Sequence, residues 1–184
     1  MKPKLAATRT LAAALLAAAF LFPAGSITAA TGLPRPWTPW PGGPTPALGL
    51  KDLNGADHAL EAYRGKVVIL NFWATWCEPC REEMPSLNRL RKSLEGQPVA
   101  MLAVNVAEGE ARINEFTGRI PVDFPVLLDR DSQAAKAWKV RVLPTTVIIG
   151  TDGRVRYTYV GGRDWNDESV RATIGSLVKE RAGR

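Results

Sequence analysis

The chain has 184 residues, 46% of them apolar, which gives room for one domain of ordinary size and enough apolar side chains for a core. This composition excludes an intrinsically disordered chain. Residues 1–30 carry three basic residues and no acid, so the remainder has 21 basic against 18 acidic residues, or +3 of the total +6. No basic run with interleaved aromatic residues occurs in the sequence, and no nucleic-acid partner is expected.

Residues 1–30 have the layout of a secretory signal. Their basic residues precede an apolar run from Leu11 to Phe22, and small residues continue to Ala29 and Ala30. The segment from Leu11 to Ala30 is also about the length that spans a bilayer as a helix. The sequence therefore predicts either a cleaved signal peptide or a retained signal anchor, which would be the chain's only membrane contact. Both predict a protein of the periplasm or of the outer face of the inner membrane.

Residues 31–46 are dominated by Pro, Gly and Trp, which favours an extended tether without regular structure. Trp37 and Trp40 within it are expected to cover an apolar strip of the domain that follows, and a contact with a partner protein is the alternative. The domain itself is expected over residues 47–184.

From residue 47 onward, strand patterns alternate with helix patterns, which predicts a mainly parallel α/β sheet. Leu48–Leu53 and Ala59–Leu60 can form a hairpin around the Asn54-Gly55 turn. The last helix is expected to be capped by Asn166 or Asp164. The expected strands are 67–73, 99–106, 124–128, 145–149 and 155–160, and the expected helices are 77–94, 110–118, 132–138 and 166–179.

Both cysteines lie in one Cys-x-x-Cys motif, Cys77 to Cys80, directly after the buried strand 67–73. As a structural bridge, a four-residue loop would stabilise the fold by only about 2 kcal/mol. Haem attachment would need a histidine where Arg81 stands, and the two cysteines with His58 leave a closed zinc site one ligand short. The motif therefore indicates a redox-active dithiol, and no metal or other cofactor is expected.

The start of a helix favours negative charge, so the pKa of the Cys77 thiol is expected to be lower than that of a free cysteine. Trp76 can shield the pair or belong to the core. Helical spacing places Glu83 at the margin of the apolar stripe that carries Cys80. Glu83 is therefore either a proton acceptor for Cys80 or a surface acid paired with an arginine. Pro144, just before a buried strand, is a candidate cis proline.

Three segments, Gly65–Leu87 with its Trp-Cys-Glu-Pro-Cys, Phe124–Asp129, and Leu143–Val147 with its Leu-Pro-Thr-Thr, resemble the TlpA and ResA-like branch of the thioredoxin superfamily. The resemblance covers about residues 47 to 180. It implies a thioredoxin-like α/β fold, in which helices flank a central mixed sheet. It also implies an N-terminal β-hairpin and one inserted βα unit around Gly109–Leu128.

The resemblance also implies roles for individual residues. Cys77 matches the attacking cysteine, Cys80 the resolving cysteine, and Glu83 the acid three places beyond it. Pro144 matches the cis-proline, and Leu143 before it would line the groove where substrate chains dock, together with Trp76. Asn71 stands where thioredoxin has a buried aspartate, so a side chain that cannot titrate replaces one that can.

The expected activity is dithiol–disulfide exchange with protein substrates. Members of this branch commonly reduce apocytochrome c or copper-site assembly proteins and draw electrons from a membrane protein of the DsbD or CcdA kind, and the resemblance implies partners of that class. A copper-binding chaperone that uses the same two thiols and a thiol peroxidase are the alternatives.

Overall fold

The structure is a computed structural model that describes residues 37–40 and 42–180, all within one compact unit. The signal predicted over residues 1–30 lies outside the described residues. Within the described ranges, no helix is both long enough and apolar enough to cross a membrane.

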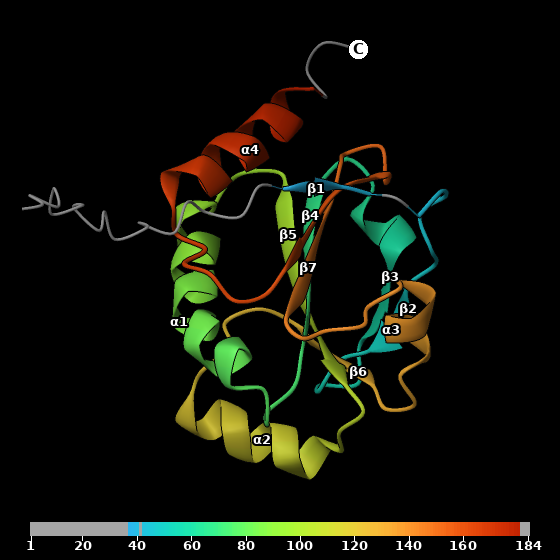
Figure 1. The fold of residues 1–184 in the computed structure, drawn as a ribbon, viewed down its shortest axis with the longest axis vertical. Helices are drawn as coiled ribbons and strands as arrows, with labels where there is room; N and C mark the ends of the chain where they lie inside the picture. The colour runs from blue at the N-terminus through green and yellow to red at the C-terminus, as the bar shows by residue number, and fades with distance from the viewer. Residues whose placement is uncertain (1–36, 41, 181–184) are drawn as a thin grey trace, which may run out of the picture. The chain divides into compact units, whose positions relative to one another are not determined.

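The described residues form a central six-stranded sheet in the order β1-β8-β7-β4-β5-β6 (Figure 1). Strand β4 pairs in parallel with β5, and β5 with β6, whereas β7, β8 and β1 are joined by antiparallel pairing. The prediction of a mainly parallel sheet is therefore wrong, because a strand buried on both faces has the same apolar pattern in either direction. The strands are β1 (Thr38–Pro39), β4 (Val67–Trp73), β5 (Val99–Val106), β6 (Val126–Asp129), β7 (Thr145–Ile149) and β8 (Val155–Val160).

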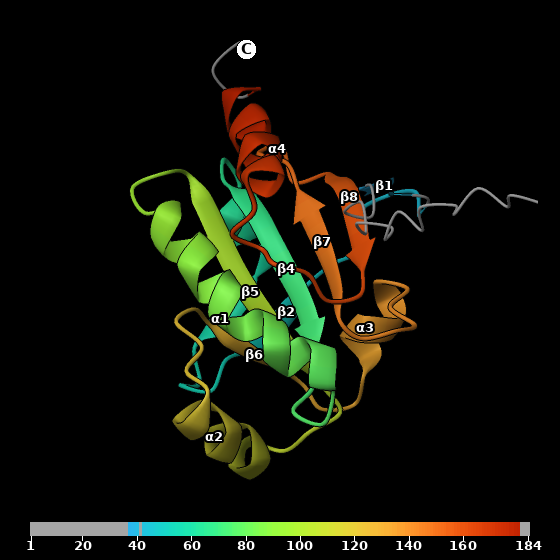
Figure 2. The same ribbon diagram turned by 60° about the vertical axis from the view of Figure 1, so that its left-hand side comes forward.

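Helices cover both faces of this sheet. Helices α1 (Glu78–Ser93) and α4 (Glu168–Lys179) lie on one face, and α3 (Gln133–Ala137) lies on the other, together with the hairpin of β2 (Gly49–Lys51) and β3 (Asp57–Ala59) and the short 3₁₀ helix η1 (Leu60–Tyr63) (Figures 1 and 2). Helix α2 (Glu110–Arg119) follows β5 and leads to β6, which forms the inserted unit. The architecture is a thioredoxin-like mixed α/β fold with the expected hairpin and insertion.

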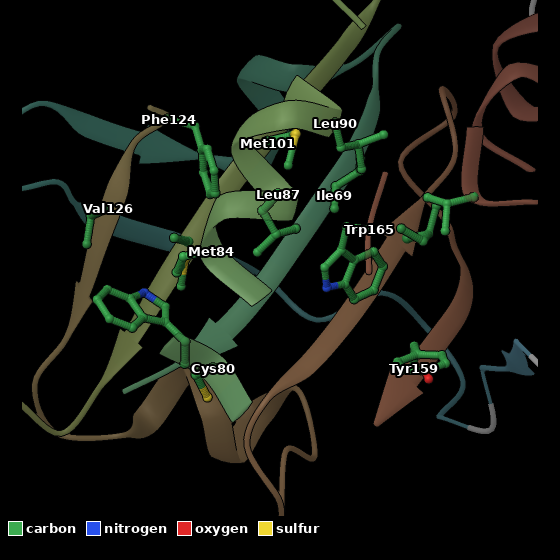
Figure 3. Close-up of a cluster of buried hydrophobic side chains, with 14 of the residues drawn as sticks. Ile69, Cys80, Met84, Leu87, Leu90, Met101, Phe124, Val126, Tyr159 and Trp165 are labelled. Carbon is green, nitrogen blue, oxygen red and sulfur yellow. The ribbon is translucent and has the colours of Figure 1, made fainter. Parts of the chain in front are cut away.

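Strand β4 divides the core into two layers. All seven of its residues are buried, and alternate side chains face opposite sides of the sheet. On the α1 side, Ile69 packs with Cys80, Met84 and Leu87, which form the apolar stripe of α1, and with Trp165 from the segment before α4 (Figure 3). The dithiol is thus anchored to the larger of the two apolar layers.

The segment expected to be a tether without regular structure contributes a strand. Thr38 and Pro39 form β1, which pairs with the edge strand β8. The ring of Trp37 packs against Tyr159 on one side of this edge, and the ring of Trp40 packs against Trp138 of the other core layer. The two tryptophans cover apolar surface of the domain, as expected.

The cap of α4 differs from the prediction. Asp167 is the N-cap, and its side chain accepts a hydrogen bond from the Ser169 backbone N–H at 2.6 Å. Asp164 instead closes a turn by accepting from the Asn166 N–H. Several Asp and Asn residues precede this helix, and Asp167, the residue directly before its first residue Glu168, is the cap.

Candidate active site

Cys77 and Cys80 form a disulfide at the start of α1, and their Cα atoms are 5.3 Å apart. Cys77 is the N-cap residue, with extended backbone, and its carbonyl accepts the Arg81 N–H. Pro79 lies in the first turn, where its missing N–H costs no helical hydrogen bond. Cys80 is fully buried, whereas Cys77 keeps 4% of its surface exposed. When the pair is reduced, the free N–H groups of the helix start favour a thiolate at Cys77.

Beside the disulfide lies the loop that carries the predicted proline. The Leu143–Pro144 peptide bond is cis, as the resemblance implied. The Pro144 carbonyl accepts the Gly161 N–H at 2.8 Å, and the next residue, Gly162, lies against Pro79 so closely that an added Cβ would be 3.1 Å from the Pro79 carbonyl oxygen. These contacts join the proline loop, the end of β8 and the cysteine motif into one surface.

Apolar side chains are exposed around this surface. Trp76, next to Cys77, is 63% exposed, so it is not a core residue. Val142, next to Leu143, is 55% exposed, and Leu143 itself is partly buried between the two core layers. Val160, also exposed, pairs with Thr145 in the ladder of β7 and β8. Exposed apolar groups gathered in this way are typical of a surface that binds a protein chain.

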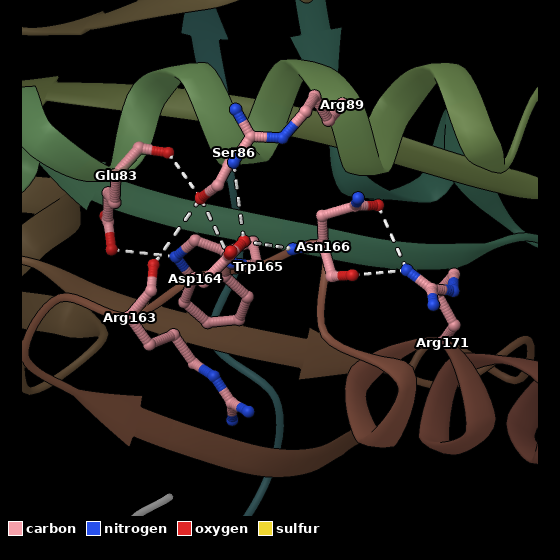
Figure 4. A network of polar contacts seen from close by, with 8 residues as sticks. All are labelled: Glu83, Ser86, Arg89, Arg163, Asp164, Trp165, Asn166 and Arg171. Carbon is pink, nitrogen blue, oxygen red and sulfur yellow. Dashed lines mark hydrogen bonds and ion pairs between the residues drawn. The ribbon is translucent and has the colours of Figure 1, made fainter.

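Glu83 lies one helical turn beyond Cys80 and is only 2% exposed, so it is not a surface acid. One carboxylate oxygen accepts the Asn71 amide at 2.9 Å, and the other accepts the Trp165 indole N–H at 2.7 Å. The Arg163 backbone N–H also donates to this carboxylate. Around it, the Ser86 hydroxyl accepts the Trp165 backbone N–H (Figure 4). Asn71, which replaces a titratable residue, thus serves to hold one that titrates.

Burial raises the pKa of Glu83 from its ordinary value of 4.5 to about 7, although the hydrogen bonds from Trp165, Asn71 and the Arg163 backbone act in the opposite direction. These donors are all neutral, so they offset only part of the cost of a buried charge. A carboxyl group with such a pKa exchanges protons at neutral pH. Its position beside Cys80 is suited to proton transfer with that thiol.

Glu108 is a site residue that the sequence analysis missed. Its carboxylate accepts the Thr75 backbone N–H at 2.7 Å, the Thr75 hydroxyl at 2.5 Å and the Asn105 amide at 2.8 Å, and it lies 3.3 Å from the Arg112 guanidinium. Thr75 is two residues before Cys77, so Glu108 fixes the loop that enters the site. The sequence carried a signal for it, because Asn105 lies at the end of β5 and Glu108 just after it. Strand β5 runs parallel to β4, and the carboxyl ends of parallel neighbours meet at one edge of the sheet.

A redox-active pair at the start of the helix that follows a central strand, beside a cis-proline loop, defines a protein of the thioredoxin-like class. Among the residues that the structure describes, no group of three or more His, Cys, Asp or Glu is placed to hold a metal ion. The model of the AhpC/TSA family matches residues 41–158, well over half of the chain, so the chain belongs to the AhpC/TSA family.

Individual relatives agree with this class. The chain is 43% identical over 120 residues to the thiol-disulfide oxidoreductase ResA of Geobacillus thermodenitrificans (strain NG80-2), which covers 65% of this chain and 69% of that protein. It is 42% identical over 114 residues to ResA of Bacillus subtilis (strain 168), covering 62% and 64%. Among solved structures, a protein from Chlorobium tepidum described as a thiol:disulfide interchange protein DsbE gives a TM-score of 0.70 at 28% identity, covering 77% and 99%. The predicted resemblance is confirmed, and the chain is a thiol–disulfide oxidoreductase.

Proposed function

We propose that this protein reduces disulfides of partner proteins in the cell envelope, with the Cys77–Cys80 dithiol as its only redox group. The observation that carries the proposal is the buried Glu83, one helical turn from Cys80, whose pKa of about 7 suits a proton acceptor. Exposed Trp76 and the loop of Leu143 and Pro144 supply the surface on which a substrate chain docks.

The reaction begins from the reduced protein. The Cys77 thiolate attacks one sulfur of the partner's disulfide, forms a mixed disulfide and releases the partner's other sulfur as a thiolate. Glu83 accepts the proton of Cys80, and the Cys80 thiolate attacks the Cys77 sulfur. The second partner thiolate leaves. Two electrons have moved to the partner, which is now a dithiol, and the Cys77–Cys80 disulfide remains.

The surroundings of Glu83 support net reduction. A dithiol is a strong oxidant when its reduced form is stabilised, above all as a thiolate. Here the side chain next to Cys80 is an acid whose hydrogen-bond donors are neutral, and a carboxylate disfavours a second negative charge beside it. The reduced form is less stabilised than in a site with a cation at that position, which favours electron donation.

We expect two kinds of partner protein, a substrate that is reduced and a membrane protein that supplies the electrons. The substrates are disulfides of the kind found in apocytochrome c or in copper-site assembly proteins, and a membrane protein of the DsbD or CcdA kind returns two electrons to the Cys77–Cys80 disulfide. The predicted signal over residues 1–30 and the names of the relatives, ResA and DsbE, support a place in the periplasm or on the outer face of the inner membrane.

Trapping the mixed disulfide tests the mechanism. In Cys80→Ser the first attack proceeds and resolution does not, so a covalent complex with the partner should accumulate and dissolve on adding reductant. Cys77→Ser is the matched control and should trap little. Mass spectrometry of the complexes also identifies the substrate. Complexes through Cys80 alone would reverse the assigned roles, and complexes from neither variant, with tight copper binding or rapid peroxide turnover by the dithiol, would favour a chaperone or a peroxidase.

A further inference from the structure

An aromatic cluster lies at the sheet edge where β1 meets β8. The ring centroid of Trp37 is 6.0 Å from that of Tyr157, 5.9 Å from that of Tyr159 and 6.0 Å from that of Trp165. Trp165 is fully buried and Tyr159 nearly so, while Trp37 is partly exposed and forms the outer wall of the cluster. The N-terminal strand therefore closes over side chains that belong to the far end of the chain.

Arg163 joins this cluster through its side chain. Its guanidinium lies 4.9 Å from the ring centroid of Tyr159, 5.5 Å from that of Trp37 and 5.7 Å from that of Trp165, within the range of cation–π attraction. The rings hold the guanidinium, while the backbone of the same residue reaches α1. Its carbonyl accepts the Ser86 hydroxyl (Figure 4), and its N–H acts on the Glu83 carboxylate.

Two groups that bind the Glu83 carboxylate, the Trp165 indole and the Arg163 backbone, are thus held in place by the ring of Trp37. We propose that Trp37 is a positioning residue of the active site, which holds Trp165 and Arg163 over Glu83 and thereby keeps this carboxyl group dry beside Cys80. The proposal rests on the proposed function only in making Glu83 the proton acceptor, and it brings the N-terminal strand into the site.

The groups that face Glu83 can be named element by element. On α1 they are Cys80, one turn earlier, and the charged Glu82 and Arg89, which line the same cavity of about 360 Å³ as Glu83. On β4 and β7 they are the neutral Asn71 and, bonded to it, Thr146. On the segment between β8 and α4 they are Trp165 and the charged Arg163 and Asp164; the last forms an exposed ion pair with Arg89 at 3.6 Å.

Removing the Trp37 ring has two consequences that lower the pKa of Glu83; a looser Trp165 hydrogen bond would act in the opposite direction, but burial is the larger influence on this group. Water reaches the face of Trp165 that Trp37 covers, which lessens the burial of the carboxyl group bound to the Trp165 indole. The Arg163 guanidinium loses one of its three rings, so its positive charge is free to approach the carboxylate. Water and a cation both favour the charged form of an acid. The pKa of Glu83 should therefore fall.

The oxidised full-length protein allows this pKa to be measured directly, because cysteines in a disulfide do not titrate. The Trp165 indole N–H, bonded to Glu83, reports the titration as a pH-dependent ¹⁵N–¹H NMR signal, which Trp165→Phe assigns by its loss. In Trp37→Ala the midpoint should fall by about one pH unit from the wild-type value. Trp37→Phe should restore it. Trp37→Leu, which keeps apolar bulk without a full ring system, should also lower it and replaces the alanine variant if that does not fold.

Trp40→Ala is the matched control, because Trp40 flanks the same strand but packs on Trp138 in the other core layer. Its midpoint should equal that of the wild type. An unchanged midpoint in Trp37→Ala, or equal falls in the Trp37 and Trp40 variants, would overturn the proposal. The measurement needs no partner protein, so it stands if trapping in Cys80→Ser fails. A shifted midpoint with an unshifted pH profile of exchange would uphold the role of Trp37 and reject Glu83 as the proton acceptor.

Discussion

Two buried acids flank the dithiol, and they differ in what binds them. Glu83, on the α1 side, is held by the Asn71 amide, the Trp165 indole and a backbone N–H, all neutral. Glu108, on the loop after β5, is held by three donors and also lies beside the Arg112 guanidinium. Both are at most 8% exposed.

Two carboxyl groups of similar burial can thus have different roles, because different groups donate hydrogen bonds to them. Neutral donors leave the cost of the buried charge on Glu83 partly unmet, so this group can take up and release a proton near neutral pH. The donors of Glu108 include the backbone and side chain of Thr75, so its contribution is to fix the loop before Cys77. Glu83 is therefore suited to proton transfer, whereas Glu108 holds the loop before Cys77 in place.

The largest expected effect is on stability as a function of pH in the oxidised protein. The folded pKa of Glu83, about 7, is above its ordinary value of 4.5, so folded protein binds more protons than unfolded protein between these values. Stability should fall as the pH rises through this window and then level off, by about 3 kcal/mol at 1.4 kcal/mol per unit. Glu83→Gln should lack this component, measured as the difference between denaturant unfolding curves from pH 4 to 8. Parallel pH dependences of the two proteins would show that the burial of Glu83 has no such cost.

A smaller effect is expected at Glu108. Glu108→Ala leaves the Thr75 N–H and the Asn105 amide without their acceptor, which should lower the free energy of unfolding by about 2 kcal/mol. Glu115→Ala, in the exposed Glu115–Arg119 pair, is the control and should cost less than about 1 kcal/mol. If the two variants were equally stable, Glu108 would not anchor the loop.

The sequence predicted one of these acids and missed the other for a physical reason. Helical spacing alone places Glu83 on the Cys80 stripe, because the two residues share a helix. The side chains that bind its carboxylate come from β4 and from the segment before α4; Trp165 is 82 residues away, and no local pattern links it to Glu83. Glu108 reaches the site through a contact between two strands, which sequence patterns indicate only once the strand pairing is known.

The strands show the same difference between features that local sequence patterns predict and features that depend on distant contacts. Strands β4, β5, β7 and β8 begin and end where predicted, because each is a continuous run of apolar and β-branched residues between turns. The direction of β7 was not predictable in this way, and neither was the pairing of β1 with β8, since both depend on contacts between distant segments. Local periodicity predicts which residues form elements, and long-range packing decides how those elements are joined.

The central claim is that Glu83 accepts the proton of Cys80, and the resolution step tests it most directly. With Cys77 held as a mixed disulfide with a small thiol, the release of that thiol reports the attack by Cys80. At pH 7 the rate in Glu83→Gln should be about 100-fold below that of the wild type, with the pH profile moved to the alkaline side, whereas Glu82→Gln, an exposed acid on the same helix, should match the wild type. Equal rates and equal pH profiles in all three proteins would contradict the account.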